Sequence, residues 1–219
     1  MSAFFVTATG TDIGKTFVTA GLIRHLRARG INARGFKPVV SGFNRAEAAK
    51  SDPGILLEAM DEAITDESLD RISPWRFATP LSPDMAAARE GRALDFNAIV
   101  AACRAQSGPG TLFIEGVGGV MVPLDARHTT LDLMAALNLP LIVVTGSYLG
   151  TISHTLTAME VIARAGLKTA VLIVNESEDS PVPLADTAAA LERFLPGIAI
   201  RALPRQAAAG EFANLAALF

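Results

Sequence analysis

Three residues near the N-terminus have the types and the spacing to hold a nucleoside triphosphate. Residues 9–16 read TGTDIGKT, in which Gly14, Lys15 and Thr16 fit the phosphate-loop pattern, while Thr9 stands where the first glycine is expected. Glycine allows the backbone to approach a phosphate, lysine carries a counter-charge, and the Thr16 hydroxyl can bind Mg²⁺. A turn without a ligand is the alternative. It is disfavoured because a strand-like run precedes the loop and a helical pattern follows it.

Two further charged residues fall at the ends of apolar runs. Glu115 ends TLFIE at residues 111–115, directly before the glycine-rich run GVGG. Lys37 lies near the carboxyl end of another apolar run, where burying an ammonium is unfavourable unless it meets an anion. Ligands of open α/β sheets bind at the carboxyl ends of the strands, so the positions of Glu115 and Lys37 indicate a magnesium and phosphate site. The alternatives are a solvated strand-end glutamate and a lysine that reaches solvent.

The remaining sequence supplies the elements that must position these side chains. Apolar strand-like runs alternate with helical patterns, which is typical of βαβ units around a parallel sheet. The sequence predicts one domain over residues 1–219, an α/β fold with a mainly parallel central sheet and helices on both faces. Strands are expected at residues 3–9, 33–40, 111–116, 140–146, 169–175 and 198–203. Helices are expected at residues 16–29, 84–90, 130–137, 151–165 and 183–194, with a loop over 43–52 and mainly helical chain over 53–108.

Composition excludes several classes of function. A formal charge of −3 gives no basic surface of the kind that nucleic-acid binding requires. No apolar run approaches the roughly 20 residues of a membrane span, and no signal peptide is visible. One cysteine, Cys103, agrees with a reducing compartment, so we expect a cytoplasmic protein without membrane or nucleic-acid partners.

Four separated segments together resemble the dethiobiotin synthetase family: residues 9–16, FKPVVSG at 36–42, IEGVGG at 114–119 and LGTISHTL at 149–156. LSPDMAA at 81–87 extends the resemblance over nearly the whole chain. The resemblance implies a P-loop NTPase-type fold and an ATP- and Mg²⁺-dependent cyclo-ligase. Such an enzyme converts 7,8-diaminopelargonate and CO₂ to dethiobiotin through a phosphorylated carbamate.

The resemblance also implies roles for individual residues. Lys37 and Lys15 would be catalytic, and Thr16, Asp52 and Glu115 would bind Mg²⁺. The alternative for Asp52 is that it caps the following helix. Asn175 would recognise the adenine base, and its alternative is an ordinary turn residue at the end of a strand. The implied nucleotide contacts are Thr11, Asp12, Ile13, Gly14, Lys15, Thr16, Phe17, Glu115, Gly118, Asn175, Leu203 and Pro204.

The implied contacts to the diamine substrate involve two chains. Within one chain they are Thr11, Lys37, Ser41 and Ser82; the partner of a homodimer would add Gly150, Thr151 and Ser153. The last of these departs from the family pattern, in which asparagine precedes the histidine. Serine reaches less far, so the contact to the substrate carboxylate is expected to be weaker or rearranged.

Two other functions share this architecture. A nucleotide-switched partitioning ATPase usually carries an extra lysine early in the phosphate loop, and residues 9–13 contain none. An amide-forming synthetase needs ammonia from a glutaminase domain, for which 219 residues leave no room. It stays open only with a separate partner chain.

Overall fold

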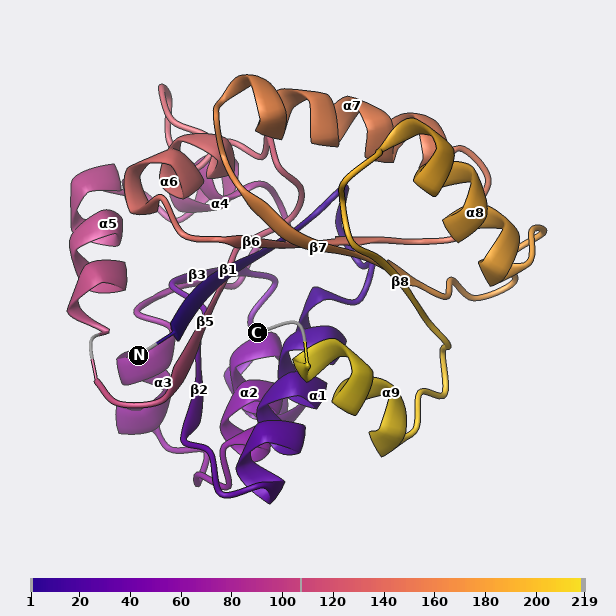
Figure 1. Ribbon diagram of the computed structural model, residues 1–219. Coiled ribbons are helices and arrows are strands. Elements are labelled where there is room, and N and C mark those ends of the chain that lie inside the picture. Colours follow the sequence, from indigo (N-terminus) through magenta and orange to yellow (C-terminus); the bar gives the residue numbers. More distant parts are fainter. Residues whose placement is uncertain (1, 107, 218–219) are drawn as a thin grey trace.

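The computed structural model describes residues 2–106 and 108–217. Within them, a six-stranded parallel sheet has the order β2-β5-β1-β6-β7-β8. Helices cover both of its faces: α1, α2 and α9 lie on one side and α6, α7 and α8 on the other (Figure 1). The expected α/β architecture is confirmed. The strands are β1 (Ser2–Ala8), β2 (Ala33–Phe36), β5 (Thr111–Glu115), β6 (Leu141–Thr145), β7 (Thr169–Asn175) and β8 (Ile200–Leu203).

The central strands are apolar along their whole length because helices cover both faces of the sheet. All five residues of β6 are buried, as are the last five of β1. The helices are α1 (Lys15–Ala28), α2 (Asp52–Ala59), α3 (Asp66–Ile72), α4 (Pro83–Arg89), α5 (Phe96–Ala105), α6 (Thr130–Leu137), α7 (Thr151–Arg164), α8 (Leu184–Phe194) and α9 (Ala209–Ala216). Most of the predicted boundaries agree to within two residues.

The expected strand over residues 33–40 is wrong in one respect. β2 ends at Phe36, and after Lys37 and Pro38 the chain continues as β3 (Val39–Ser41), which pairs with β4 (Trp75–Phe77) in a separate two-stranded sheet. Proline lacks a backbone N–H and interrupts the ladder. Lys37 donates its own N–H to Ile72 O at 2.9 Å, outside the main sheet. The break carries the Lys37 side chain over the end of β5.

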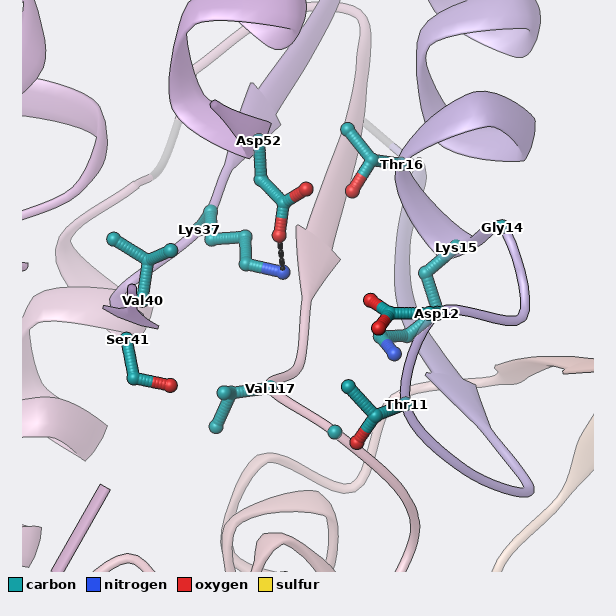
Figure 2. A pocket seen from close by; sticks show the side chains of 11 residues that line it. Thr11, Asp12, Gly14, Lys15, Thr16, Lys37, Val40, Ser41, Asp52 and Val117 are labelled. Atoms are coloured by element: carbon teal, nitrogen blue, oxygen red, sulfur yellow. Dashed lines mark ion pairs between the residues drawn. The ribbon is translucent and has the colours of Figure 1, made fainter. Parts of the chain in front are cut away.

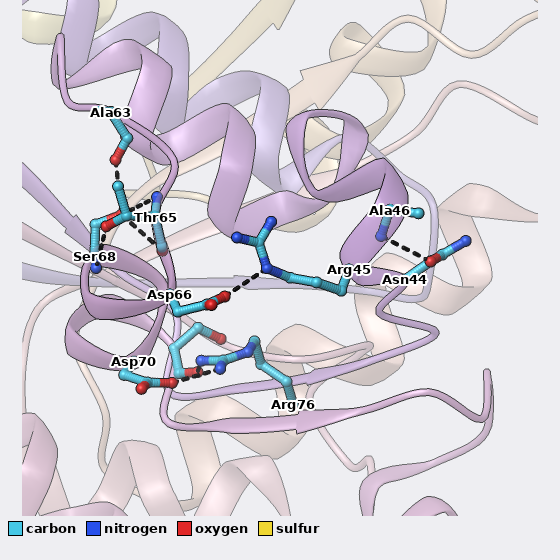
Figure 3. Close-up of polar contacts among 10 residues, drawn as sticks. Asn44, Arg45, Ala46, Ala63, Thr65, Asp66, Ser68, Asp70 and Arg76 are labelled. Atoms are coloured by element: carbon cyan, nitrogen blue, oxygen red, sulfur yellow. Dashed lines mark hydrogen bonds and ion pairs between the residues drawn. The ribbon is translucent and has the colours of Figure 1, made fainter.

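The segment between the two short strands also differs from expectation. Instead of a loop, residues 43–52 contain a 3₁₀ helix (Arg45–Lys50), and the strand β4 lies inside the stretch expected to be helical. Exposed ion pairs link this region: Arg45 to Asp66, and Arg76 to Asp70 (Figure 3). Such pairs contribute little stability individually. Helix α2 follows the 3₁₀ helix, and its first residue, Asp52, faces the Lys37 side chain.

In the described part of the chain, no helix combines the length and the apolar composition that crossing a membrane requires.

Candidate functional site

A cavity of about 350 Å³ opens at the carboxyl ends of β1, β2 and β5. The phosphate loop forms one side, and β3 together with the start of α2 forms the other (Figure 2). This is the edge at which ligands of open parallel sheets bind. The structure therefore brings together the predicted phosphate-loop residues with Lys37, Ser41 and Asp52. The lining residues are Thr11, Asp12, Gly14, Lys15, Thr16, Lys37, Val40, Ser41, Asp52, Val117 and Gly118.

A lysine ammonium at the floor of this cavity lies between two carboxylates. Lys37 Nζ is 2.6 Å from Asp52 Oδ2 and 2.8 Å from Glu115 Oε1, and it donates to Gly116 O at 3.2 Å. The Thr16 hydroxyl donates to the same Glu115 Oε1 at 2.6 Å. Lys37 is 2% exposed and Glu115 is fully buried. The cluster thus joins the phosphate loop, β5 and α2 through charge-assisted hydrogen bonds.

Electrostatics keep Lys37 and Asp52 ionised. Burial alone would lower the pKa of Lys37, but the neighbouring Glu115 and Asp52 carboxylates outweigh burial and hold that pKa above its ordinary value. For Asp52, burial acts to raise the pKa, and the Lys37 ammonium lowers it to below its ordinary range. Lys37 therefore remains a cation at the floor of the site at neutral pH.

Lys15, the phosphate-loop lysine, has a different environment. It is 7% exposed, and its Nζ donates to Gly10 O at 3.3 Å. Burial first, and then the charge of Lys37, lower the pKa of Lys15 to about 8. The carboxylates of Glu115, Asp52 and Asp12 offset these effects only in part, so this ammonium is poised to gain from an incoming phosphate.

Proton uptake on nucleotide binding would report this environment. Phosphate oxygens beside Lys15 should raise its pKa from about 8, so ADP binding at pH 8 is expected to take up about half a proton. Calorimetry of ADP binding in buffers with different ionisation enthalpies measures the uptake. A Lys15→Arg variant, which stays protonated, should show none. Equal uptake by that variant and the parent protein would contradict the assignment.

The oxygen atoms around Glu115 fit a divalent cation. Glu115 Oε2 is buried and accepts no hydrogen bond within the described residues, and hard cations such as Mg²⁺ prefer carboxylate and hydroxyl oxygens. The alternative interpretation of Asp52 as a helix cap is wrong, because Ser51 accepts the hydrogen bond from Gly54 N at 3.3 Å. The Asp52 carboxylate is consequently free to face the cavity, as Figure 2 shows.

A second cavity of about 450 Å³ adjoins the phosphate loop. Asn175 ends β7 there and donates from Nδ2 to Ile13 O at 2.9 Å, while its Oδ1 is buried without a hydrogen-bond partner among the described residues. Asn175 is therefore more than a turn residue. The Asn175 Oδ1 atom could accept a hydrogen bond from the amino group of a nucleotide base. The lining residues are Asp12, Ile13, Gly14, Phe17, Asn175, Glu176, Ser177, Glu178 and Arg205.

Sequence reasoning missed the charged rim of this second cavity. Glu176 and Glu178 follow β7, and Arg205 joins them from the other end of the chain: its backbone N–H donates to Glu176 Oε2 and its Nη2 to Glu178 Oε2, both at 2.9 Å. The polar run directly after an apolar strand was the available signal. The contribution of Arg205 carries no comparable local pattern.

Three of the predicted residues, Ser82, Leu203 and Pro204, line neither of these two cavities. Ser82 occupies the N-cap position of α4 and makes no capping hydrogen bond. Leu203 is buried at the end of β8, where its carbonyl accepts from Glu176 N at 2.9 Å. Pro204 lines a neighbouring cavity of about 720 Å³. Their assignments to substrate and nucleotide stay predictions.

The residues expected from a partner subunit lie at the start of α7. Gly150 precedes the helix with φ 96°, and Ser153 is exposed in the first turn. The Thr151 hydroxyl points inward and donates to Gly146 O at 2.8 Å. Its backbone N–H donates to Tyr148 O at 3.1 Å, so both donors of Thr151 are engaged within its own chain. These three residues do not line the first cavity of their own chain.

Comparisons with known proteins agree with this geometry. A family model described as an AAA domain matches residues 2–210. The ATP-dependent dethiobiotin synthetase BioD of Acidiphilium cryptum is 51% identical over 89% of this chain and 89% of its own length. Its namesake from Phenylobacterium zucineum is 46% identical over 94% of this chain and 89% of its own length.

Solved structures support the fold. The chain is similar to the MinC:MinD cell division protein complex of Aquifex aeolicus, with a TM-score of 0.57, 11% identity, and coverage of 99% of this chain and 86% of that one. The cell division ATPase MinD of Pyrococcus furiosus gives a TM-score of 0.56 and 16% identity over 94% of this chain and 84% of its own. At such identities the likeness shows the fold alone. The expected P-loop NTPase-type fold is confirmed.

Proposed function

Since the chain belongs to the family of ATP-dependent dethiobiotin synthetases, we propose that it converts 7,8-diaminopelargonate, CO₂ and ATP to dethiobiotin, ADP and phosphate. The family fixes the coarser statement: the protein is an ATP-dependent carbon–nitrogen cyclo-ligase of biotin biosynthesis. The identity of the substrates and the chemical steps are the proposal. We also propose that the chain forms a single domain and acts in the cytoplasm.

The proposed reaction has three bond-forming steps. One amine of the diamine attacks CO₂ and loses a proton, which gives a carbamate. A carbamate oxygen then attacks the γ-phosphorus of ATP, and ADP leaves. The second amine attacks the carbonyl carbon of this mixed anhydride, phosphate leaves with the bonding electrons, and loss of a proton completes the cyclic urea. No enzymic nucleophile is needed, so alignment and charge neutralisation supply the catalysis.

The observation that carries the proposal is the buried Lys37 ammonium. It lies at the floor of the first cavity, between the phosphate loop and β3, and is 2% exposed. Asp52 and Glu115 contact this ammonium in the structure, so an anionic carbamate would gain its positive charge once those two carboxylates held a divalent cation instead. Ser41 and Thr11, which line the same cavity, would bind the substrate, and Lys15 would neutralise the transferred phosphate.

Mg²⁺ belongs to the same proposal. Thr16, Asp52 and Glu115 would hold it, on the strength of the free Glu115 Oε2 and the oxygen donor set. When bound, the ion supplies charge neutralisation to the phosphates. Asp52 and Glu115 then act by fixing its place, and the Thr16 hydroxyl adds a neutral oxygen.

A symmetric homodimer would complete the substrate site. Thr151 N and His154 N already donate to Tyr148 O and Gly150 O, so the N–H groups of Ile152 and Ser153 in the first turn of α7 would seat a carboxylate. The neighbouring Leu149 is 81% exposed. Lys37→Met and Ser153→Asp subunits should each be inactive alone. Mixed in equal amounts they should regain about a quarter of the parent activity, because half of the dimers then contain one intact site. If the mixed variants recovered no activity although sedimentation showed one dimeric species, Lys37 and Ser153 would have to act in the site of the same chain.

The decisive assay measures phosphate release from ATP–Mg²⁺ and bicarbonate with and without 7,8-diaminopelargonate, and follows the product by mass. We expect strict dependence on the diamine and the appearance of dethiobiotin. Rapid ATP hydrolysis without the diamine would reject the proposal. It would instead favour a nucleotide-switched ATPase on the same fold.

A further inference from the structure

Helix α9 packs closely against α1 through one aromatic ring. Phe212 is 7% exposed, and a Cβ added to Gly21 would lie only 2.0 Å from its Cε1 and 2.2 Å from its Cζ. Any side chain at position 21 would therefore collide with the ring. The absence of a side chain on α1 at this point is what allows α9 to bring Phe212 onto the helix that begins at the phosphate loop.

The same ring contacts a residue of the second cavity. Phe212 packs edge-on against Phe17, with ring centroids 5.7 Å apart and an interplanar angle of 65°. Phe17 lies one helical turn before Gly21, lines the second cavity and is 40% exposed. An aromatic side chain that is this exposed can adopt several rotamers unless a neighbour restrains it. Phe212 is such a neighbour.

The start of the C-terminal segment is fixed to another part of that cavity. Arg205 donates to Glu176 and Glu178, which follow β7 on the rim. Residues 204–216 thus leave the sheet at the rim and cross to α1, beside which α9 lies (Figure 1). The C-terminal segment contributes both a wall and a support to the second cavity.

We propose that Phe212 is a positioning residue for nucleotide binding, which holds the Phe17 ring as an apolar wall against the base. The inference rests on the proposed function in one respect, namely that a nucleotide base occupies the second cavity. Phe212 itself does not line either cavity and acts only through Phe17.

The test compares two ligands and two variants of α9. Affinities for ADP, which carries a base, and for inorganic tripolyphosphate, which does not, are measured by calorimetry. Phe212→Ala should weaken ADP binding about three- to tenfold, the range for one edge-to-face aromatic pair, and leave tripolyphosphate binding unchanged. Leu215→Ala is the matched control, because Leu215 is 2% exposed on the same helix. It should lose stability without a change in either affinity.

A second variant keeps the test sharp if truncation of Phe212 unfolds α9. Gly21→Ala adds one methyl group that must displace the Phe212 ring, and it should reproduce the selective loss of ADP affinity. In steady-state kinetics, both variants should raise KM for ATP while kcat and KM for the diamine stay unchanged. Equal losses for ADP and tripolyphosphate, an equal effect of Leu215→Ala, or an unchanged ADP affinity would each overturn the proposal. Since ADP binding needs no turnover, a protein that makes no dethiobiotin but shows the selective loss would reject only the proposed reaction.

Discussion

Replacing Lys37 by methionine is expected to lower kcat for dethiobiotin formation at least about 1,000-fold, while ADP affinity in the absence of metal stays within about threefold. Methionine preserves the length of the side chain and removes the ammonium that contacts Asp52 at 2.6 Å and Glu115 at 2.8 Å. In the proposed reaction this charge serves the carbamate, not the nucleotide. Steady-state turnover and calorimetry of ADP binding measure the two effects separately.

The same substitution should destabilise the fold in a pH-dependent way. Removing one partner of a buried ion pair costs about 3–5 kcal/mol, because the remaining charge is left without compensation. The Lys37 ammonium lowers the pKa of Asp52. The contact between Lys37 and Asp52 therefore stabilises the fold above the ordinary Asp52 pKa of 3.8, and this stabilisation is lost as the pH falls below that value. The difference in free energy of unfolding between parent and variant should therefore be largest near neutrality and shrink below about pH 4. Denaturant titrations across this range give the difference.

Lys15→Met is the matched control for Lys37→Met, since both remove one ammonium from the same cavity. Burial lowers the pKa of Lys15, and among the residues that the structure describes no carboxylate contacts its ammonium as Asp52 and Glu115 contact Lys37, so its loss should not destabilise the protein. ADP affinity, in contrast, should fall sharply. If Lys37→Met instead abolished ADP binding and kept its stability, Lys37 would belong to the nucleotide.

The regions that sequence predicted well are those in which one local pattern determines both the element and the site. The buried strands ending at Ala8 and Glu115 are apolar runs, and parallel pairing of neighbouring strands necessarily brings their carboxyl ends to one edge. The phosphate loop and Glu115 could therefore be placed together without knowledge of any contact between them. Lys37 was recognised because an ammonium in an apolar run is unfavourable unless an anion meets it.

The regions that could not be predicted depend on contacts between distant segments. The three-residue strands β3 and β4 pair with one another across more than thirty intervening positions, and three residues are too few to show a periodicity. Whether Asp52 capped a helix or faced a cavity depended on Ser51 taking the capping bond. Nor does Gly21 have any local signal for the ring of Phe212, because a glycine inside a helix only appears as a weak helix former.

A Gly14→Ala substitution is expected to weaken ADP binding at least about 100-fold, for two independent reasons. Gly14 has φ +95°, a conformation that costs an L residue about 1–3 kcal/mol. In addition, the new Cβ would lie 2.3 Å from Asn175 Nδ2, so the Asn175 amide would have to abandon Ile13 O. One methyl group would thereby disturb the phosphate loop and the second cavity together. Calorimetry of ADP binding and denaturant unfolding measure the outcome.

Gly30→Ala separates the backbone strain from the collision. Gly30 follows the other end of α1 with φ +75°, and apart from its chain neighbours no heavy atom of the described residues lies within 4 Å of the Cβ that alanine would add. This variant should lose stability but bind ADP normally, and a Gly14→Ala variant that did the same would show that the loop tolerates the methyl group. Adding Asn175→Ala to Gly14→Ala then removes the group that collides. Because directly contacting residues are not additive, the double variant should bind ADP more tightly than the two single losses together imply. Strict additivity would mean that the strained backbone at Gly14, and not its contact with Asn175, governs nucleotide binding.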